Sequence, residues 1–306
     1  MKRYIVLFIL LCLVFTGACN RKLKSDTIVN DTKPSIEKDL IDEDTIDKDE
    51  VDISDEELNK PLVVETEKPA VVENINELDN TKIGWGLSVN TDGNTPGIPD
   101  LWKSLLKTYN GVYIGDTTKK EVFLTFDLGY EAGFTPSILD TLKENEVKAA
   151  FFFTGHFLTT QKVLVLRMIS EGHIIGNHTE NHPSIPTIPA AELKKEIKDL
   201  NLRVLNETNF KMTYFRPPSG EFSEKTLSII NSLGFKTIFW SLAFKDWEPL
   251  NGGPDESYTT VMSRLHNGAI ILLHGTSKDN TLALDKIIKS IKEEGFEFKT
   301  LDQLTK

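Results

Sequence analysis

Polar side chains stand at the ends of several short apolar runs of this chain, and their types are those that catalyse hydrolysis. The apolar runs predict buried β-strands at residues 122–126, 149–153, 173–175, 213–215, 236–240 and 269–273. The polar residues that close or follow these runs are Asp127, His178, His182, Arg216, Asp246 and His274. Because the carboxyl ends of parallel strands meet at one edge of a sheet, we expect these six side chains to converge on one site.

Two of the six, His178 and His182, are spaced four residues apart. On a helical turn both imidazoles would face one side and could share a metal ion. A pair with this spacing is, taken alone, more often two surface histidines beside a loop. Pro183 follows at once, so the pair is expected on a turn rather than deep in a helix.

The remaining four residues suggest two ion pairs. A strand ending in His274 together with Asp246 indicates an imidazolium held by a carboxylate, as a general acid requires. Arg216 could pair with Asp127 and keep that carboxylate ionised. The alternatives are a satisfied histidine at the edge of a core and a surface arginine before the rigid prolines 217–218.

The elements that must position these residues alternate along the chain. Between the apolar runs, a 3.6-residue period predicts helices at residues 136–143, 160–169, 190–205, 223–233 and 282–293. Strands that alternate with helices predict an α/β fold with a parallel sheet and crossover connections. We expect a small, distorted or incomplete (β/α) barrel, with a doubly wound open sheet as the competing topology.

Taken together and in order, the polar pieces resemble the motifs of the NodB-homology polysaccharide deacetylases, from about Trp85 to the C-terminus. The five motifs of that family have counterparts at residues 125–129, 178–182, 216–220, 246–247 and 272–274. Flanking sequences such as Gly129-Tyr130-Glu131 are similar to one branch, the spore-cortex muramic de-N-acetylases, which act on the way to muramic δ-lactam.

This resemblance implies hydrolytic de-N-acetylation of peptidoglycan amino sugars. Position by position, it implies that Asp127 is the base that activates water, oriented by Arg216, and that His274 is the acid that protonates the amine, with its pKa tuned by Asp246. It also implies that His178 and His182 are metal ligands. The backbone N–H near Ser219 would be an oxyanion donor, and Trp247 would contact the substrate. Such a division of labour suits amide hydrolysis, which needs a polarised carbonyl, an activated water and a protonated leaving nitrogen.

Two positions depart from the family pattern. Leu128 stands where most members have a second aspartate, so a two-histidine site should bind its divalent metal, expected to be zinc, weakly. Glu131 could approach the metal instead. Ser219 stands where a basic residue is expected to meet the lactyl carboxylate of N-acetylmuramic acid, and Lys245, just before Asp246, is a possible replacement.

Three functions remain open at this point. The resemblance favours N-acetylmuramic acid as the substrate, and the first alternative is an N-acetylglucosamine deacetylase of vegetative peptidoglycan or of another polysaccharide. The second alternative is a non-catalytic, wall-binding lipoprotein, whose expected feature would be loss of Asp127 or His274, yet both residues are present. A monomer that binds peptidoglycan glycan strands and no nucleic acid is expected.

The N-terminus predicts export and a lipid anchor. Lys2 and Arg3 precede an apolar run at residues 4–15, and small residues lead into Cys19, as in a lipoprotein signal peptide over residues 1–19. Thr16 weakens the resemblance to a lipobox, and an uncleaved signal anchor is the alternative. Either form predicts the outer face of the cell membrane.

An acidic stretch follows the signal segment. Residues 26–80 contain nineteen Asp and Glu against five Lys, with no glycine and no aromatic residue. Such a composition cannot bury enough apolar surface to fold, which predicts a disordered linker over residues 20–82 and a deacetylase domain over residues 83–306. The stretch carries a net charge of −14 and the whole chain −11, so the rest of the chain carries +3 and is almost neutral.

Overall fold

The computed structural model describes residues 74–304. The predicted signal segment, Cys19 and the linker up to residue 73 lie outside this range. The strands within it are β1 (Ile83–Gly84), β2 (Gly111–Val112), β3 (Glu121–Leu128), β4 (Ala150–Phe153), β5 (Ile174–Asn177), β6 (Tyr214–Phe215), β7 (Glu221–Phe222), β8 (Lys236–Ile238), β9 (Ala269–His274) and β10 (Glu297–Phe298). The α-helices are α1 (Asp100–Thr108), α2 (Thr135–Glu144), α3 (Gly155–Ser170), α4 (Ala190–Thr208), α5 (Glu224–Ser232), α6 (Gly253–Ser263) and α7 (Lys278–Glu293).

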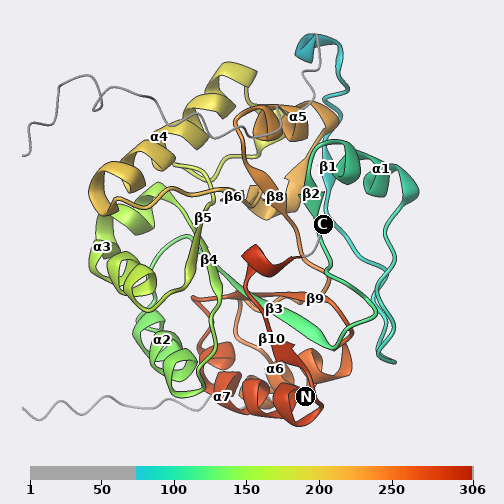
Figure 1. The fold of residues 1–306 in the computed structure, drawn as a ribbon, viewed down its shortest axis with the longest axis vertical. Coiled ribbons are helices and arrows are strands. Elements are labelled where there is room, and N and C mark those ends of the chain that lie inside the picture. The colour runs from blue at the N-terminus through green and yellow to red at the C-terminus, as the bar shows by residue number, and fades with distance from the viewer. Residues whose placement is uncertain (1–73, 305–306) are drawn as a thin grey trace, which may run out of the picture. The chain divides into compact units, whose positions relative to one another are not determined.

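The main sheet is curled, with its strands at the centre and the helices around them (Figure 1). Its neighbours β3, β4, β5, β6 and β8 pair in parallel and in chain order, and β9 pairs with β3. Past the end of β8, Leu242 forms an isolated parallel bridge with Ile271 of β9. The path of strands therefore returns to its start. The expected distorted barrel is confirmed, and the doubly wound alternative is wrong, since such a sheet reverses its strand order.

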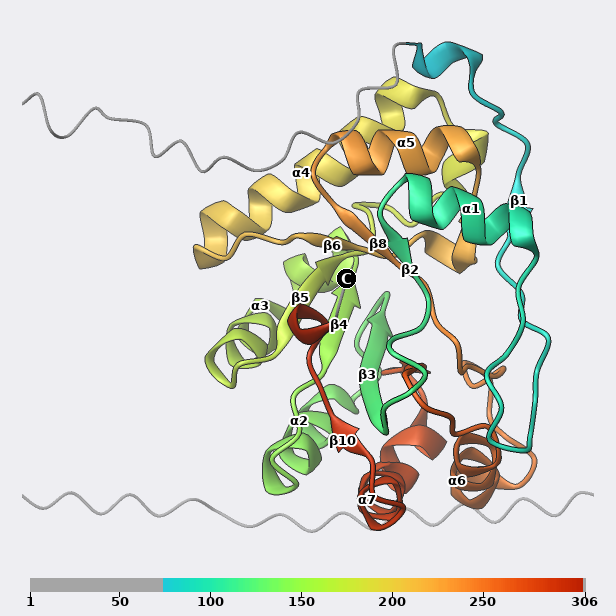
Figure 2. The same cartoon turned by 45° about the vertical axis from the view of Figure 1, so that its right-hand side comes forward.

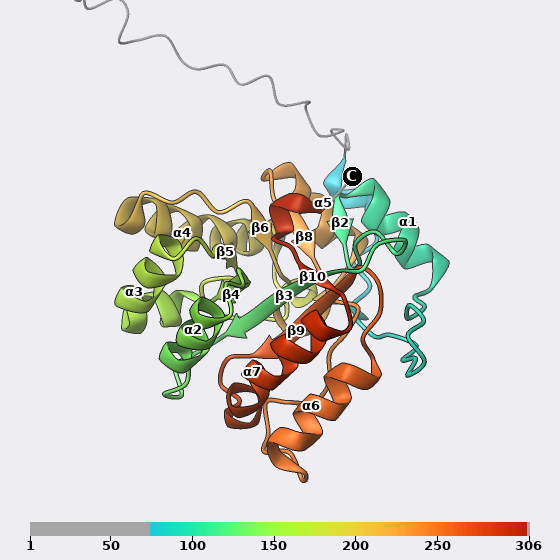
Figure 3. The ribbon, with the colours of Figure 1, turned by 60° about the horizontal axis from the view of Figure 1, so that its bottom comes forward.

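Helices α2, α3, α4 and α7 lie on the outside of the strands, as a turned view shows (Figure 2). Helices α6 and α7 lie side by side against the part of the barrel that contains β9 (Figure 3). Side-chain caps begin several of them, because Thr154, Ser223 and Ser277 accept hydrogen bonds from the first turns of α3, α5 and α7. These caps set where each helix starts after its strand.

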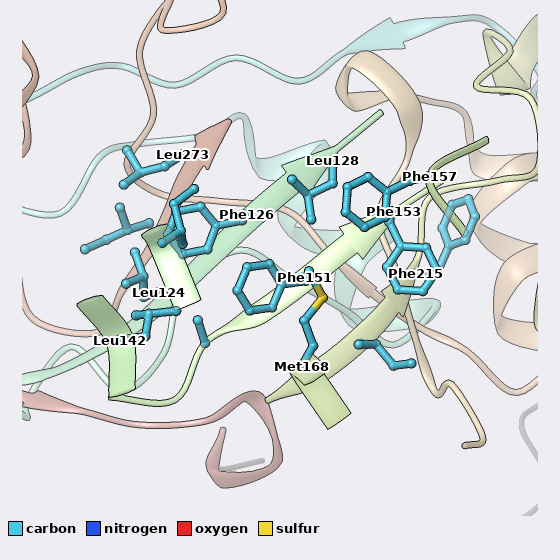
Figure 4. Packing of buried hydrophobic residues seen from close by; sticks show 14 of the residues in the cluster. Leu124, Phe126, Leu128, Leu142, Phe151, Phe153, Phe157, Met168, Phe215 and Leu273 are labelled. Carbon is cyan, nitrogen blue, oxygen red and sulfur yellow. The ribbon is translucent and has the colours of Figure 1, made fainter. Parts of the chain in front are cut away.

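Both faces of the central strands are buried, so they show no alternation of polar and apolar residues. The outward face of β3 carries Leu124, Phe126 and Leu128, which pack with Phe151 and Phe153 of β4 (Figure 4). The inward face forms a second cluster that includes residues of the C-terminal segment. Its members are Phe123, Ala150, Phe152, Ile174, Tyr214, Ile238, Ile270, Leu301 and Leu304. The barrel interior is thus filled at its amino end.

Sequence and structure differ in some elements. Helices α1 and α6 are absent from the sequence-based expectations, and α3 begins five residues earlier than expected. Helix α6 has weak intrinsic propensity, because it contains Gly, Pro, Ser and Thr, and it is held by packing against α7. Within residues 74–304 no helix is both long and apolar enough to cross a bilayer.

The folded domain begins before the expected boundary at residue 83. Ile75 packs against the main core, and the Asn80 side chain donates to Pro186 O at 3.0 Å. Asn80 also accepts from Ser223 Oγ at 2.8 Å, and Asp79 O accepts from Lys225 N at 3.0 Å. Residues 74–82 therefore belong with the domain rather than with a linker.

These contacts lead to a stability prediction. A chain that begins at Asn74 should melt within about 1 °C of the full mature chain, because residues 26–73 are too polar to add core. A chain that begins at Lys82 loses three hydrogen bonds and the packing of Ile75, on the order of 2–4 kcal/mol. Its melting temperature should fall by about 5–10 °C. Equal melting of the two truncated chains in calorimetry would contradict this.

Candidate active site

The parallel direction of the strands brings the polar residues at their ends to one end of the barrel. Asp127 lies on the inward face of β3, two residues after Thr125, and pairs in register with His274, the last residue of β9. His178 directly follows β5 and Arg216 directly follows β6. Since all of these strands run in parallel, the four side chains meet at their carboxyl ends.

Arg216 is fully buried and is held by three hydrogen bonds. Its Nη1 donates to Asp127 Oδ1 at 2.8 Å, its Nη2 to Thr125 Oγ1 at 2.9 Å and its Nε to Ile238 O at 3.1 Å. The guanidinium also stacks on Phe152, with Cζ 4.1 Å from the ring centroid. Arg216 therefore has one fixed position below the site.

This ion pair controls the charge of Asp127. Burial is the largest single effect and raises the pKa of its carboxyl, but the charge and hydrogen bond of Arg216 together with the nearby imidazoles outweigh burial and hold this pKa below its usual range. Asp127 Oδ1 is occupied by Arg216, whereas Oδ2 lies 3.8 Å from His178 Nε2. The carboxylate is thus ionised at neutral pH and presents one oxygen to the site.

His178 and His182 meet as expected, but on a loop and not on a helical turn. Thr179 and His182 have positive φ angles of 68° and 59°, and His182 N donates to Thr179 Oγ1. The two ring centroids are 4.9 Å apart and the planes are inclined by 70°. The tight loop, not helical periodicity, brings the imidazoles together.

The two imidazoles have the chemistry of metal ligands. His178 Nδ1 lies 2.8 Å from Arg216 O, so the nitrogen donates its proton there and leaves Nε2 with a free lone pair. Burial lowers the pKa of His178 to about 4 and also lowers the pKa of His182. Both rings are neutral at pH 7, as metal ligation requires. This donor set fits a divalent ion held by two protein ligands.

A third protein ligand is missing from this arrangement. Leu128 points into the core and is fully buried, so it leaves no carboxylate at the position of the family's second aspartate. Glu131 does not approach the histidines, because its Oε1 accepts from Gly133 N and Thr135 N near the start of α2. Within residues 74–304 no group of three or more His, Cys, Asp or Glu side chains could hold a metal ion.

On the other side of the site, His274 is bound to Asp246. His274 Nδ1 lies 2.6 Å from Asp246 Oδ1, and His274 N donates to Oδ2 at 2.8 Å. Burial alone would lower the pKa of His274, but the hydrogen bond and charge of Asp246, aided by Asp127, outweigh burial and raise this pKa. The imidazole is therefore a proton carrier whose Nε2 remains free.

Two further residues, which the sequence reasoning missed, hold Asp246. The Asn280 side chain of α7 donates to Asp246 Oδ2, and Ser257 Oγ of α6 donates to Asn280 Oδ1 at 2.7 Å. Both side chains are buried. Since Ser257 occupies the amide oxygen, Asn280 must turn its NH₂ group toward the carboxylate. No local sequence signal marks this pair, because their partners lie 23 and 34 residues away.

Asp127, His178, His182 and His274 line a cavity of about 660 Å³. Aromatic rings form much of its wall, with Trp247 at 5.3 Å from His274 between ring centroids and more than half exposed. Ser219 also lines it, in a left-handed conformation with φ of 54°. The lining residues are Trp85, Asp127, Gly129, Tyr130, His178, His182, Ser219, Gly220, Trp240, Ala243, Phe244, Trp247, Leu272, His274 and Thr276.

Lys245 does not reach this cavity, although its neighbours in sequence do. Its amino group pairs with Glu248 Oε2 at 2.7 Å, and both side chains are about 60% exposed. The chain turns Phe244 and Trp247 toward the cavity and Lys245 away from it. In this structure Lys245 therefore lies outside the cavity and does not stand in for a basic residue at position 219.

Comparisons with known proteins identify the family of the chain. The family model described as polysaccharide deacetylase matches residues 114–238. The chain is 47% identical over 229 residues to an uncharacterised 30.6 kDa protein of Geobacillus stearothermophilus, covering 74% of this chain and 86% of that one.

Several relatives are named as deacetylases, and two of them bear on the choice of sugar. The peptidoglycan-N-acetylmuramic acid deacetylase PdaA of Bacillus subtilis is 42% identical over 227 residues, with 74% and 86% of the two chains covered. Its solved structure, called a family 4 carbohydrate esterase, superposes with a TM-score of 0.72 over 74% of this chain and 98% of that one, at 41% identity. A peptidoglycan-N-acetylglucosamine deacetylase of Bacillus cereus is 34% identical over 206 residues, covering 66% and 74%. The chain therefore belongs to the polysaccharide deacetylase family, whose members are hydrolases that are in general metal-dependent.

Proposed function

We propose that the chain removes the acetyl group from N-acetylmuramic acid in peptidoglycan, on the way to muramic δ-lactam in spore cortex. The observation that carries the chemistry is the facing pair of Asp127 and His274, whose pKa values are shifted in opposite directions. A lowered carboxyl pKa and a raised imidazole pKa leave one base and one acid in the same cavity at neutral pH. The choice of sugar is supported by the 42% identity with PdaA.

In this proposal each catalytic residue has one task. Asp127 Oδ2 takes a proton from the attacking water while Arg216 holds the other oxygen. As the C–N bond breaks, His274 Nε2 gives its proton to the leaving nitrogen, and Asp246 stabilises the imidazolium that donates it. A divalent metal held by His178 and His182 would polarise the acetyl carbonyl. The backbone N–H of the Ser219 turn supplies an oxyanion donor, and Trp247 contacts the sugar.

The first alternative is deacetylation of N-acetylglucosamine, which the 34% identity with the Bacillus cereus enzyme keeps open. The two sugars differ by a 3-O-lactyl group. Product analysis on glycan strands that contain both sugars therefore distinguishes a muramic deacetylase from a glucosamine deacetylase. Mass spectrometry should find free amines on muramic residues only. Free amines on glucosamine alone would overturn the muramic proposal and leave the reaction class unchanged. Muramic δ-lactam should also be missing from the cortex of a deletion strain.

The second alternative, a wall-binding protein without activity, is disfavoured because Asp127 and His274 both line the cavity and each is bound to its partner, Arg216 or Asp246. Purified protein that binds peptidoglycan but releases no acetate from either sugar would support it.

We also propose that the metal is zinc, bound weakly. Neutral imidazoles suit zinc better than magnesium or calcium, and two protein ligands give less affinity than three. Dialysis against a chelator should lower kcat at least about tenfold, and added zinc or cobalt should restore it. Metal content measured by mass spectrometry after equilibrium dialysis gives a readout that does not depend on activity. His178→Ala should reduce bound zinc below one tenth per chain, and an unchanged content in this variant would contradict the assignment.

The location follows from the same set of proposals. Cys19 carries lipid and holds a monomeric enzyme on the outer face of the membrane, where peptidoglycan lies. This rests on the residues before Cys19, not on any part of the described structure. Intact mass of the membrane-bound protein tests it, because a start at Met1 or Lys2 with no acyl mass would overturn the anchor.

A further inference from the structure

The catalytic cavity lacks an obvious partner for an anionic substrate. N-acetylmuramic acid carries a lactyl carboxylate next to the carbon that bears the acetamido group, and a selective site needs a cation near it. Among residues 74–304, no lysine or arginine lines the cavity of about 660 Å³, nor the cavity of about 680 Å³ that adjoins it at His182. Arg216 is fully buried and satisfied by its three acceptors, so it is unavailable to substrate.

A third cavity adjoins the catalytic one on the opposite side. It measures about 450 Å³ and shares Trp247 and Thr276 with the catalytic cavity. Its lining includes one lysine, Lys278, the first residue of α7. Lys278 follows His274 by four residues, across a turn in which Ser277 N donates to His274 O at 3.1 Å. The turn that positions the proton donor therefore also positions this cation.

The charge of Lys278 is available to a ligand. Its side chain is exposed, and among residues 74–304 its amino group makes no ion pair or hydrogen bond. Three carboxylates line the same cavity, and each already has a partner other than Lys278. Asp246 binds His274 and Asn280. Glu248 pairs with Lys245 at 2.7 Å, and Asp279 Oδ2 accepts from Leu250 N at 2.9 Å.

We propose that Lys278 binds the lactyl carboxylate of N-acetylmuramic acid, in the cavity beside Trp247, and so selects the muramic sugar. This inference rests on the proposed function and names the residue that makes it selective. The exposed lysine costs little desolvation until substrate covers it, and the contact then becomes a charge-assisted hydrogen bond. Such a contact is worth roughly five- to fiftyfold in kcat/KM.

A cycle of two protein variants and two substrates tests the contact. The substrates are peptide-free glycan strands with free lactyl carboxylates and the same strands after methyl esterification, which removes the charge and keeps the bulk. Lys278→Met should lower kcat/KM for the acid roughly five- to fiftyfold and leave the ester within about twofold. Lys278→Arg should retain most of the activity on the acid. Lys245→Met is the matched control, because it removes an exposed, paired lysine from the neighbouring loop, and it should change neither substrate by more than about twofold.

The outcomes distinguish a failure of the role of Lys278 from a failure of the proposed muramic deacetylation. An unchanged acid-to-ester ratio in Lys278→Met, or an equal loss on both substrates, overturns the role of Lys278 while muramic deacetylation stands. A larger effect from Lys245→Met than from Lys278→Met would show that Lys245 binds the carboxylate, and it would also overturn the role of Lys278. Wild-type protein that deacetylates only N-acetylglucosamine oligomers would overturn both the substrate and the role of Lys278.

Discussion

Asp127→Asn is expected to lower kcat by at least about a hundredfold, because general base catalysis contributes typically 10²–10⁴. The substitution keeps an oxygen for Arg216 and removes the basic Oδ2, which is the atom free to face the reacting water. Acetate release from peptide-free glycan strands, measured under saturating substrate, gives kcat directly. Near wild-type turnover in this variant would contradict the proposed role of Asp127 as the general base.

The same variant should also be less stable. A measurement of activity alone could not distinguish this loss of folded protein from the loss of the catalytic base. Arg216 is fully buried and would keep its charge without a counter-ion, a change that costs about 3–5 kcal/mol when a buried pair is broken. The matched control is Asp140→Asn, which removes an aspartate from the exposed pair with Arg167. It should change stability by less than about 1 kcal/mol. Turnover must therefore be measured below the melting temperature of each variant.

His274→Gln should lower kcat/KM by about 10²–10³ and remove the alkaline limb of the pH profile. The acid must be protonated, so activity is present below the pKa of His274 and is lost as pH rises through it. The base must be ionised, so activity is lost as pH falls through the lowered pKa of Asp127. The wild-type profile is thus a bell whose alkaline limb lies above the usual range of histidine.

A second variant distinguishes this assignment from a structural role for His274. Asp246→Asn removes the hydrogen-bonded charge that raises the pKa of His274, and burial then dominates and lowers it. The alkaline limb should move to lower pH while the acidic limb stays in place. If both limbs of kcat/KM stay where they are in the wild type, Asp246 does not act through His274.

The sequence by itself determined the family, the barrel and the group of residues that meet. Apolar runs interrupted by amphipathic helices predict parallel strands, and the residues at the strand ends must then share one edge. This inference needs no contact information, since it follows from chain direction alone. It predicted that Asp127, His178, Arg216 and His274 meet at one end of the barrel before any distance was known. The departure at Leu128, in contrast, was visible from the resemblance to the family motif.

Only the tertiary structure decided contacts that depend on how loops turn. The loop around His182 uses left-handed residues where the spacing suggested a helical turn, because several backbone solutions bring two rings together. Lys245 and Lys278 both stand near motif residues in sequence, yet one is exposed against Glu248 and the other lines a cavity beside Trp247.

The residues that support His274 also depend on the tertiary structure. Asn280 and Ser257 belong to helices α7 and α6, and they reach Asp246 because those helices pack together. A pattern along the chain records which side of a helix is apolar, but it does not record which partner that side meets. Side-chain pairs from distant segments are set by packing in three dimensions, and for this reason the residues around His274 could not be read from the sequence.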